Sequence, residues 1–426
     1  MSVPAHDVAD LGLAAAGRAR IEWAEGQMPV LAQIRRRFAQ ARPLEGIRVA
    51  ACLHVTAETA NLVETLVAGG AQVALCAANP LSTQDDVAAA LVADGGAQVH
   101  ATRAESAEDY TRHVTRLIET DPHVTIDDGA DLATTIHAAR PQHAAAMRGG
   151  TEETQAGLLR LRALESEGSL ACPILAVNEA RTERAFNDRF GTGQSTMDGI
   201  LRATNLLLAG RMLVVLGYGP TGHGIAERAR GAGASVVVCE VDPLKALEAR
   251  MEGYEVMPAL EAAARGDVFV TVTGSRDVLV REHFERMKDG AVLANAGHFD
   301  VEINVGDLLE LAGAPAREVL PLVEEYRVAG RRLNLLASGR VVNLAAAEGH
   351  PAAVMDMSFA NQALCVEYLV ASGPTLARRV LPVPDVIDRE VARLKLESLG
   401  VMIDSLTPSQ RDYLSTWTRE GTAGTR

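Results

Sequence analysis

Three glycines in one short segment have the spacing of a site that binds a dinucleotide phosphate. Gly217-Tyr218-Gly219-Pro220-Thr221-Gly222 has the form GxGxxG, with an apolar run before it (212–216) and a helix-period segment after it (225–230). The first glycine permits a tight turn, the second lets a pyrophosphate approach the backbone, and the third allows close helix–strand packing. The helix N-terminus adds partial positive charge. With these flanks, the segment predicts a nucleotide site that includes Thr221.

An acidic residue follows at the distance such a site requires. The next apolar run, 236–239, ends in Glu240, 23 residues after Gly217. A carboxylate there accepts hydrogen bonds from both ribose hydroxyls and repels a 2′-phosphate, which selects NAD over NADP. The alternative is a glycine turn in a nucleotide-free domain, but strand, helix and acid together favour NAD.

A second set of polar residues follows predicted strands in the N-terminal half. His54 comes after the apolar run 47–53, Asp131 lies just beyond 124–126, and Glu153 precedes a helix. Each also has a structural interpretation: Thr56 and Asp131 fit helix caps, and Glu58 fits a first-turn partner of a helix dipole. His298, after the apolar run 292–294, is either structural or close to a bound nicotinamide.

The elements that must position these residues form an α/β pattern. Short runs rich in Val, Ile and Leu alternate with amphipathic stretches such as 57–68, which predicts parallel sheets covered on both faces. The expected strands are 47–53, 71–76, 124–126, 174–177, 212–216, 236–239, 268–271, 292–294, 333–336 and 341–344. The polar stretch 178–194 separates two such series. From Val383 the pattern becomes helical and charged.

Composition excludes several classes of function. The formal charge of −14 and an aromatic content of 4% argue against nucleic-acid binding. No apolar run approaches the ~20 residues of a membrane span, and no basic n-region marks a signal peptide. The five cysteines are widely spread without any CxxC, so we expect no metal site, reduced thiols and a cytoplasmic protein.

Several long strings resemble the S-adenosyl-L-homocysteine hydrolase (adenosylhomocysteinase) family, in its short archaeal and thermophile-type branch. The resemblance runs from about Ile21 to Trp417. The strings are 54–60 (HVTAETA), 79–86 (NPLSTQDD), 127–132 (DDGADL), 191–195 (GTGQS), 240–243 (EVDP), 296–302 (AGHFDVE) and 349–351 (GHP). The insertion in the substrate domain and the Lys…Tyr-Arg-Tyr tail of the longer enzymes are absent.

The resemblance implies a chemistry and a role for each matching residue. Tightly held NAD oxidises the ribose 3′-hydroxyl, the ketone acidifies the C4′ proton, a base removes that proton, and the group on C5′ leaves. The implied catalytic residues are His54, Asp131, Glu153, His298, Glu183 and Asn187. The implied substrate-binding residues are Thr56, Glu58, His350, Met355 and Phe359. The implied cofactor-binding residues are Thr154, Asp188, Gly217, Gly219, Thr221, Gly222, Glu240 and Asn343.

The chain departs from the family pattern beside the ribose. The family's Lys, which helps the ribose hydroxyl lose its proton, is replaced by Glu183, and its Asp-Asn pair becomes Asn187-Asp188. At an effective dielectric constant near 20, reversing one contacting charge is on the order of several kcal/mol. Such a site should bind an unmodified ribose differently and deprotonate it by another route.

Three functional hypotheses remain. The favoured one is NAD-dependent dehydration of an adenine nucleoside to a 4′,5′-unsaturated product, a reaction suited to nucleoside antibiotic biosynthesis. The first alternative is an authentic hydrolase that releases adenosine and homocysteine, with drift at Glu183. The second alternative is an inactive NAD-binding regulator.

The resemblance also implies a domain arrangement. We expect a substrate domain at 1–180 with 350–390 returning to it, a Rossmann-type NAD domain at 190–347, and a C-terminal helical oligomerisation tail at 391–426. Tyr413 and Trp417 of the tail should contact a neighbouring subunit of a homotetramer.

Overall fold

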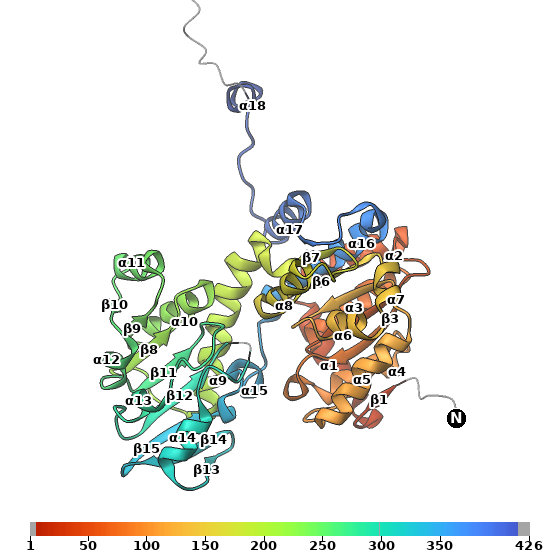
Figure 1. The fold of residues 1–426 in the computed structure, drawn as a ribbon. Helices are drawn as coiled ribbons and strands as arrows, with labels where there is room; N and C mark the ends of the chain where they lie inside the picture. Colours follow the sequence, from red (N-terminus) through yellow and green to blue (C-terminus); the bar gives the residue numbers. More distant parts are fainter. Residues whose placement is uncertain (1–5, 298, 416–426) are drawn as a thin grey trace, which may run out of the picture.

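The first of two sheets carries the N-terminal half of the protein. The computed structural model describes residues 6–297 and 299–415, and Figure 1 shows the two sheets with their covering helices as separate bodies. Every neighbouring pair of strands in the first sheet is parallel, in the order β1-β4-β3-β2-β5-β6-β7-β16. The strands are β1 (Asp7–Val8), β2 (Arg48–Leu53), β3 (Gln72–Ala77), β4 (Ala97–Ala101), β5 (Val124–Asp127), β6 (Gly149–Glu152), β7 (Ile174–Ala176) and β16 (Val380–Pro382).

Helices cover both faces of this sheet. On one face lie α1 (Ala14–Glu25), α2 (Pro29–Ala41), α3 (Ala57–Ala68), α4 (Asp85–Ala93), α16 (Ala352–Ser372) and α17 (Asp385–Ser398). On the other lie α5 (Ala107–Glu119), α6 (Asp131–Ala139), α7 (Pro141–Ala146) and α8 (Gln155–Ser166). Helix α5 illustrates the local cause: Ser106 caps it by accepting from the Asp109 N–H, and Val114, Leu117 and Ile118 bury one stripe.

The second sheet has the order β10-β9-β8-β11-β12-β15-β14-β13 and turns antiparallel at its last two pairings. Its strands are β8 (Met212–Leu216), β9 (Ser235–Cys239), β10 (Glu255–Val256), β11 (Val268–Thr271), β12 (Ala291–Asn295), β13 (Arg317–Leu320), β14 (Val323–Val328) and β15 (Arg331–Leu336). Its helices are α9 (Gly193–Thr204), α10 (Pro220–Gly231), α11 (Pro243–Met251), α12 (Ala259–Ala263), α13 (Arg281–Phe284), α14 (Val305–Ala312) and α15 (Val342–Ala345). The expected α/β class with two parallel-sheet domains is confirmed, and the exact domain limits stay predictions.

Both sheets contain a point where the strand order reverses. In the first sheet β2 lies between β3 and β5, and in the second β8 lies between β9 and β11. Open α/β sheets bind ligands beyond the carboxyl ends of their strands at such points. The loops after β2 and β8 are therefore placed to form ligand sites.

The chain crosses between the sheets near the two expected places. The first crossing runs through a π-helix, η4 (Glu183–Thr192), and the second passes through Gly349 at a φ of +82°. Thr192 Oγ1 lies 2.9 Å from His350 Nε2 and joins the two crossings. Because π-helical geometry is uncommon and concentrates at functional sites, η4 is a candidate for site-forming structure.

Several local expectations were incomplete or wrong, and strands β1, β4, β10, β13, β14 and β16 were not among those expected. The apolar segment 341–344 is mainly helix α15, with only an isolated bridge from Val341 to Asn295, because a four-residue apolar run fits either state. Strand β6 was not foreseen because its sequence, Gly-Gly-Thr-Glu, lacks the apolar signal although all four residues are buried.

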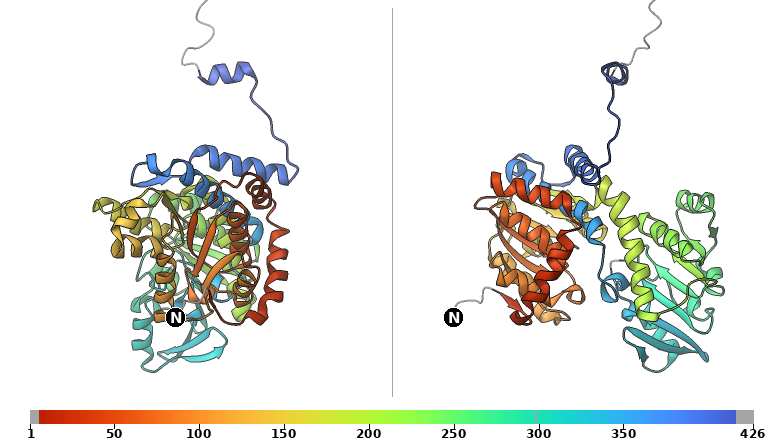
Figure 2. Two further views of the ribbon diagram at one scale, coloured as in Figure 1. Left: turned by 90° about the vertical axis from the view of Figure 1, so that its right-hand side faces the viewer. Right: turned by 180° about the vertical axis from the view of Figure 1, so that it is seen from behind.

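The C-terminal part leaves the body of the protein after α17. Figures 1 and 2 show an extended segment that leads away to α18 (Pro408–Ser415), whose described residues are all exposed. Trp417 lies outside the described residues. Within the described ranges, none of the helices combines the length and apolar character that crossing a membrane requires.

Candidate functional site

A cavity of about 1190 Å³ lies between loops of the two sheets. From the first sheet it is lined by residues after β2, β5 and β6, and from the second by residues after β8, β11 and β12. The two crossings and α16 contribute Asn187, His350 and Phe359. The cavity therefore joins both strand-order reversals.

The glycine-rich turn fits a dinucleotide at each of its three glycines. Gly217 has a φ of +106°, which only glycine adopts readily. A Cβ on Gly222 would lie 2.0 Å from the Gly217 carbonyl oxygen, so the turn packs directly on α10. A Cβ on Gly219 would meet no atom within 4 Å, and Gly219 and Thr221 line the cavity. The backbone is thus open to a pyrophosphate at the N-terminus of α10.

Glu240 lies beside this turn as expected. Its carboxylate accepts from the backbone N–H groups of Tyr218 (2.6 Å), Val241 (2.7 Å) and Asp242 (3.0 Å). Although burial opposes the change, these bonds lower the pKa of Glu240. An ionised Glu240 next to the phosphate turn is suited to accept from ribose hydroxyls and to oppose a 2′-phosphate.

We expect Glu240→Gln to weaken NAD binding about 10- to 100-fold, the effect of losing a hydrogen bond to a charged group. Binding of NADP should weaken less, so that the preference for NAD falls. Titration calorimetry of both cofactors with the apoprotein measures this. Asp242→Asn is the matched control, because Asp242 caps α11 through the Leu244 N–H. Equal affinity of the unaltered protein for NAD and NADP would contradict the role of Glu240.

His54 is held by a partner at each ring nitrogen. Its Nδ1 lies 2.7 Å from Ser82 Oγ, and its Nε2 lies 3.3 Å from Asp128 Oδ2. Because the Ser82 hydroxyl donates to the Asn79 carbonyl, Nδ1 of His54 must donate to Ser82. With Nε2 facing a carboxylate, the ring is arranged to donate from both nitrogens and to give a proton to a ligand in the cavity.

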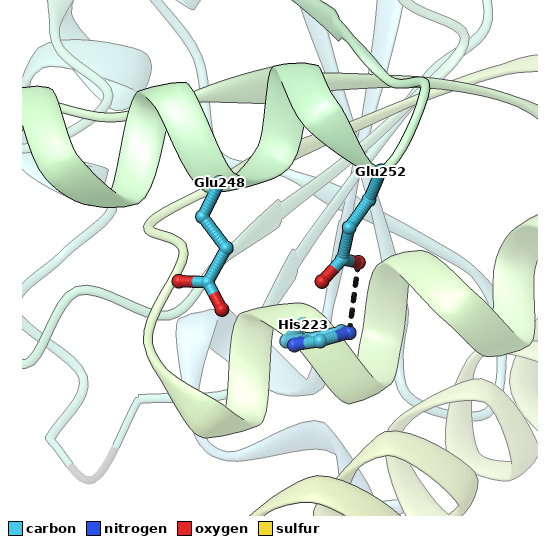
Figure 3. A group of neighbouring side chains, drawn as sticks. All are labelled: His223, Glu248 and Glu252. Carbon is cyan, nitrogen blue, oxygen red and sulfur yellow. Dashed lines mark ion pairs between the residues drawn. The ribbon is translucent and has the colours of Figure 1, made fainter.

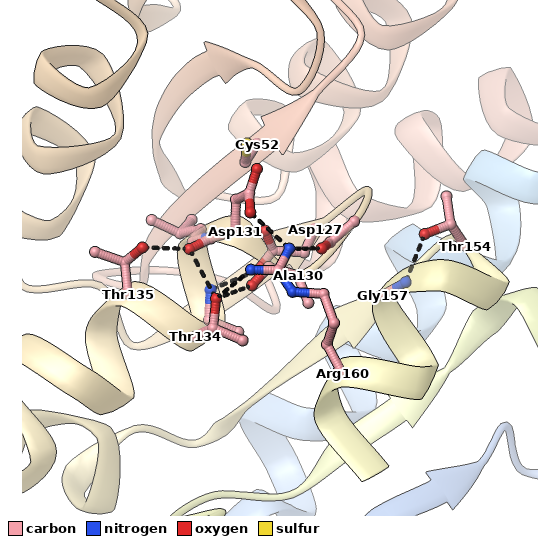
Figure 4. Close-up of polar contacts among 12 residues, drawn as sticks. Cys52, Asp127, Ala130, Asp131, Thr134, Thr135, Thr154, Gly157 and Arg160 are labelled. Carbon is pink, nitrogen blue, oxygen red and sulfur yellow. Dashed lines mark hydrogen bonds and ion pairs between the residues drawn. The ribbon is translucent and has the colours of Figure 1, made fainter. Parts of the chain in front are cut away.

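Asp131 is fixed by two donors, one to each carboxylate oxygen. The Tyr110 hydroxyl donates to Oδ2 at 2.6 Å, and Nη1 of Arg160 donates to Oδ1 at 2.6 Å. Figure 4 shows Arg160 reaching from α8 to Asp131 at the start of α6. Asp131 does not cap its helix; Asp127 does so by accepting from the N–H groups at 132 and 133. The structural interpretation of Asp131 is therefore wrong, and its carboxylate lines the cavity.

A buried cluster of carboxyl groups occupies the diverged part of the site. Glu153 accepts from Ser358 and Gln362, and Glu183 accepts from the Asn187 amide one turn along η4. Burial raises the pKa of Glu153 to about 7 and that of Asp188 to about 6. Burial, and then the charges of Glu153 and Asp188, raise the pKa of Glu183 well above its ordinary value. The surroundings of Glu183 therefore favour its neutral, protonated form.

Two atoms of this cluster lack partners. Oε2 of Glu183 and Oδ1 of Asn187 have no hydrogen-bond partner among the described residues, and both side chains are buried. Asn187 lines the cavity, whereas Glu183 lies behind the lining. The amide oxygen of Asn187 can therefore accept from a ligand hydroxyl, while Glu183 behind it accepts from the amide nitrogen and orients the side chain.

Glu183→Gln should change how stability depends on pH. In the unfolded chain Glu183 loses its proton near pH 4.5, whereas in the folded protein it keeps the proton to higher pH. Since the folded state then binds more protons, stability falls as pH rises through this window. Glutamine lacks this penalty, so the melting temperature of Glu183→Gln should gain on that of the unaltered protein as the pH rises above 4.5. Exposed Glu261→Gln is the control, and parallel pH curves for Glu183→Gln and the unaltered protein would contradict the burial argument.

The five expected substrate-binding residues all line the same cavity. They are Thr56, Glu58, His350, Met355 and Phe359. Burial raises the pKa of Glu58 and lowers that of His350 to about 4, with the charge of His54 adding to the effect on His350. Thr56 also caps α3 through the Thr59 N–H, so its structural interpretation holds beside its place in the cavity. A polar edge and an apolar wall are what a purine base requires.

The remaining expected cofactor-binding residues also face the cavity. Thr154, Asp188 and Asn343 line it, and Oδ1 of Asn343 has no partner among the described residues. The Asn343 amide donates to Ser195 Oγ at 3.2 Å, which orients the side chain. His298 lies outside the described residues; its neighbours Gly297 and Phe299 line the cavity.

One other group in the described part of the chain has metal-ligand character. His223, Glu248 and Glu252 place one ligand atom each within 4.8 Å of the others, and Figure 3 shows them between α10 and α11. Nε2 of His223 lies 2.9 Å from Glu252, whose carboxylate also accepts from the Tyr218 hydroxyl at 2.9 Å. None of the three ligand residues lines the large cavity. An ion pair and a hydrogen bond account for His223 and Glu252 without a metal ion.

Several residues of the site were not singled out from the sequence. They are Tyr110, Arg160, Ser358 and Gln362. All four lie on helices without a local motif, and only the fold brings them to the carboxylates. Asp128, which contacts His54, was a candidate because it follows a predicted strand together with Asp127 and Asp131.

Two family models match most of the chain. The model described as S-adenosyl-L-homocysteine hydrolase, NAD binding domain, matches residues 188–349, and the S-adenosyl-L-homocysteine hydrolase model matches residues 5–144. An adenosylhomocysteinase of Aquifex aeolicus is 59% identical over 96% of this chain and 98% of its own length. An S-inosyl-L-homocysteine hydrolase of Methanopyrus kandleri is 52% identical over 98% of each chain. Among solved structures, a dipicolinate synthase from Bacillus halodurans has a TM-score of 0.50 at 12% identity, covering 77% of this chain and 99% of that chain, a likeness of fold alone.

Proposed function

We infer that this chain acts on an adenine nucleoside by elimination at C5′. The inference starts from the fact that the chain belongs to the S-adenosyl-L-homocysteine hydrolase family and uses NAD. We propose further that the leaving group is the 5′-hydroxyl. The product is then a 4′,5′-unsaturated nucleoside and water.

The residues of the cavity divide the acid–base work. NAD, when bound, supplies the hydride acceptor for the 3′-carbon and returns the hydride at the end. Glu153, whose pKa of about 7 suits a general base, takes the proton of the 3′-hydroxyl. Asp131, held as a carboxylate, takes the C4′ proton made acidic by the 3′-ketone. His54 gives a proton to the departing oxygen, which water requires because it is a poor leaving group.

The single observation that carries the proposal is the neutral pair formed by Glu183 and Asn187. The resemblance places a Lys and an Asp at these two positions, so the pair has lost both charges together. The unpartnered Oδ1 of Asn187, which lines the cavity, supports binding of a neutral hydroxyl there, with Glu183 holding the Asn187 amide from behind. With His54, Asp131 and Glu153 retained, the elimination chemistry remains available to a changed substrate.

Product analysis by mass spectrometry tests the proposal. The NAD-loaded protein is incubated separately with adenine nucleosides that carry a free 5′-hydroxyl and with S-adenosylhomocysteine. We expect a product one water molecule lighter from a nucleoside, and little homocysteine from S-adenosylhomocysteine. A His54→Asn sample identifies background breakdown.

The second candidate is hydrolysis of S-adenosylhomocysteine. The 59% identity with an adenosylhomocysteinase across nearly the whole chain favours it. Rapid homocysteine release without a dehydrated nucleoside in the same experiment would establish this candidate, and Glu183 would then be a tolerated change.

We also propose that the protein is a homotetramer joined in part by its C-terminal tail. Met402 and Ile403 are 95% and 74% exposed, and Tyr413 and Leu414 are exposed on α18. Light scattering should give four times the mass of 45.1 kDa, and removal of residues after Gly400 should reduce it. A monomeric mass for the full chain would contradict the proposal.

A further inference from the structure

Tyr110 lies on α5, outside every motif of the chain, yet it touches the reactive carboxylate. Its hydroxyl donates to Asp131 Oδ2 at 2.6 Å, a short distance for an O–H bond to an anion. Tyr110 lines the same cavity as Asp131. The bond therefore acts on an atom that faces the substrate.

Arg160 completes the hold on the carboxylate. It donates to Asp131 Oδ1 at 2.6 Å and is itself anchored by the Gly129 carbonyl and Thr134 Oγ1. With one donor on each oxygen, the carboxylate cannot rotate without breaking a charge-assisted bond. Two fixed donors therefore set the plane of Asp131.

The surroundings of Tyr110 keep it a donor. Burial, and then the charges of Cys52 and Asp131, raise the pKa of the Tyr110 hydroxyl. Cys52 Sγ, 3.9 Å from the hydroxyl oxygen, is fully buried. Tyr110 therefore remains protonated throughout the working range of pH and keeps its hydroxyl donating to Asp131.

We propose that Tyr110 is a positioning residue that, together with Arg160, orients Asp131 for removal of the C4′ proton. The assignment of that step rests on the proposed function. Proton removal from C4′ is common to dehydration and hydrolysis, so Tyr110 has the same role whichever group leaves. The rate of proton transfer to a carboxylate that is held in one plane falls steeply when the carboxylate becomes free to move.

The test compares Tyr110→Phe with the unaltered holoenzyme by deuterium exchange at C4′ of adenosine in heavy water. We expect the maximal exchange rate to fall at least tenfold, while the adenosine concentration that gives half-maximal exchange changes little. Formation of reduced nicotinamide, which reports oxidation at C3′, should persist. Tyr326→Phe is the matched control, because its hydroxyl also donates to a carboxylate, Glu324, away from the cavity. An unchanged maximal exchange rate in Tyr110→Phe would overturn the proposal.

A second readout does not depend on the reaction. The carboxylate stretch of Asp131, assigned by the infrared difference from Asp131→Asn, should change in frequency in Tyr110→Phe, because one of its two donors is lost. If the unaltered protein forms reduced nicotinamide without C4′ exchange, the proposed elimination fails. The infrared frequency then decides the role of Tyr110, and an unmoved band rejects it.

Discussion

Replacing His54 by asparagine is expected to lower the rate of 5′-elimination about 10²- to 10⁴-fold, the usual contribution of a general acid. Oxidation at C3′ should still occur, because that step uses Glu153 and the cofactor. Single-turnover experiments separate the two steps: reduced nicotinamide should accumulate while the dehydrated product forms slowly.

The hydrogen bonds of His54 explain why asparagine is the informative substitution. Its amide can still bond to Ser82 and Asp128, so the local structure has partners, but it cannot release a proton. Ser82→Ala is the matched control, because it keeps the imidazole and its Asp128 contact while removing the acceptor at Nδ1. We expect a smaller loss in Ser82→Ala. Equal losses in both steps for His54→Asn would indicate that His54 binds the substrate rather than acting as the acid.

The nucleotide turn was predictable because its physics is local. Gly217, Gly219 and Gly222 each meet a requirement set by neighbours within one strand–turn–helix unit. The acid at Glu240 follows from the next strand of the same unit. Such a site can be deduced from sequence because the contacts that define it have short sequence separation.

The carboxylate network was predictable only in part, because its partners are distant along the chain. Glu153 is bonded by Ser358 and Gln362, more than 200 residues away. No local pattern marks these two polar residues on α16, whose sequence is otherwise largely apolar. The resemblance identified Glu153, while only the fold shows what sets its pKa.

At Glu183 the sequence identified the position, and the structure was needed to infer its charge. Sequence comparison located the exchanged residues, but it left open whether the new carboxyl is charged. A charged Glu183 would repel Glu153 and Asp188, and burial beside those two groups raises its pKa and so favours the neutral form. The exchange of Lys and Asp for Glu and Asn is therefore better described as the loss of a charge pair than as a charge reversal.

Restoring that charge pair should convert the substrate preference. In Glu183→Lys combined with Asn187→Asp, we expect nucleoside dehydration to fall at least tenfold and homocysteine release from S-adenosylhomocysteine to rise at least tenfold, a change of more than about 1.4 kcal/mol in each barrier. A lysine at position 183 would lie among Glu153, Asp188 and the carboxylate introduced at position 187, so its charge would be compensated and the fold retained. Both rates are measured by mass spectrometry on the NAD-loaded variant.

Glu183→Gln separates charge from shape at this position. Glutamine keeps the size of a protonated glutamic acid, and its side-chain oxygen can still accept from the Asn187 amide, so dehydration should stay within a few-fold of the unaltered rate. A large loss in Glu183→Gln would mean that Glu183 exchanges a proton during the reaction and acts as a base. If the double variant changes neither rate, the pair does not determine the substrate. Together the two variants distinguish a neutral binding pair from a proton-transferring one, because only the neutral pair tolerates glutamine while responding to lysine.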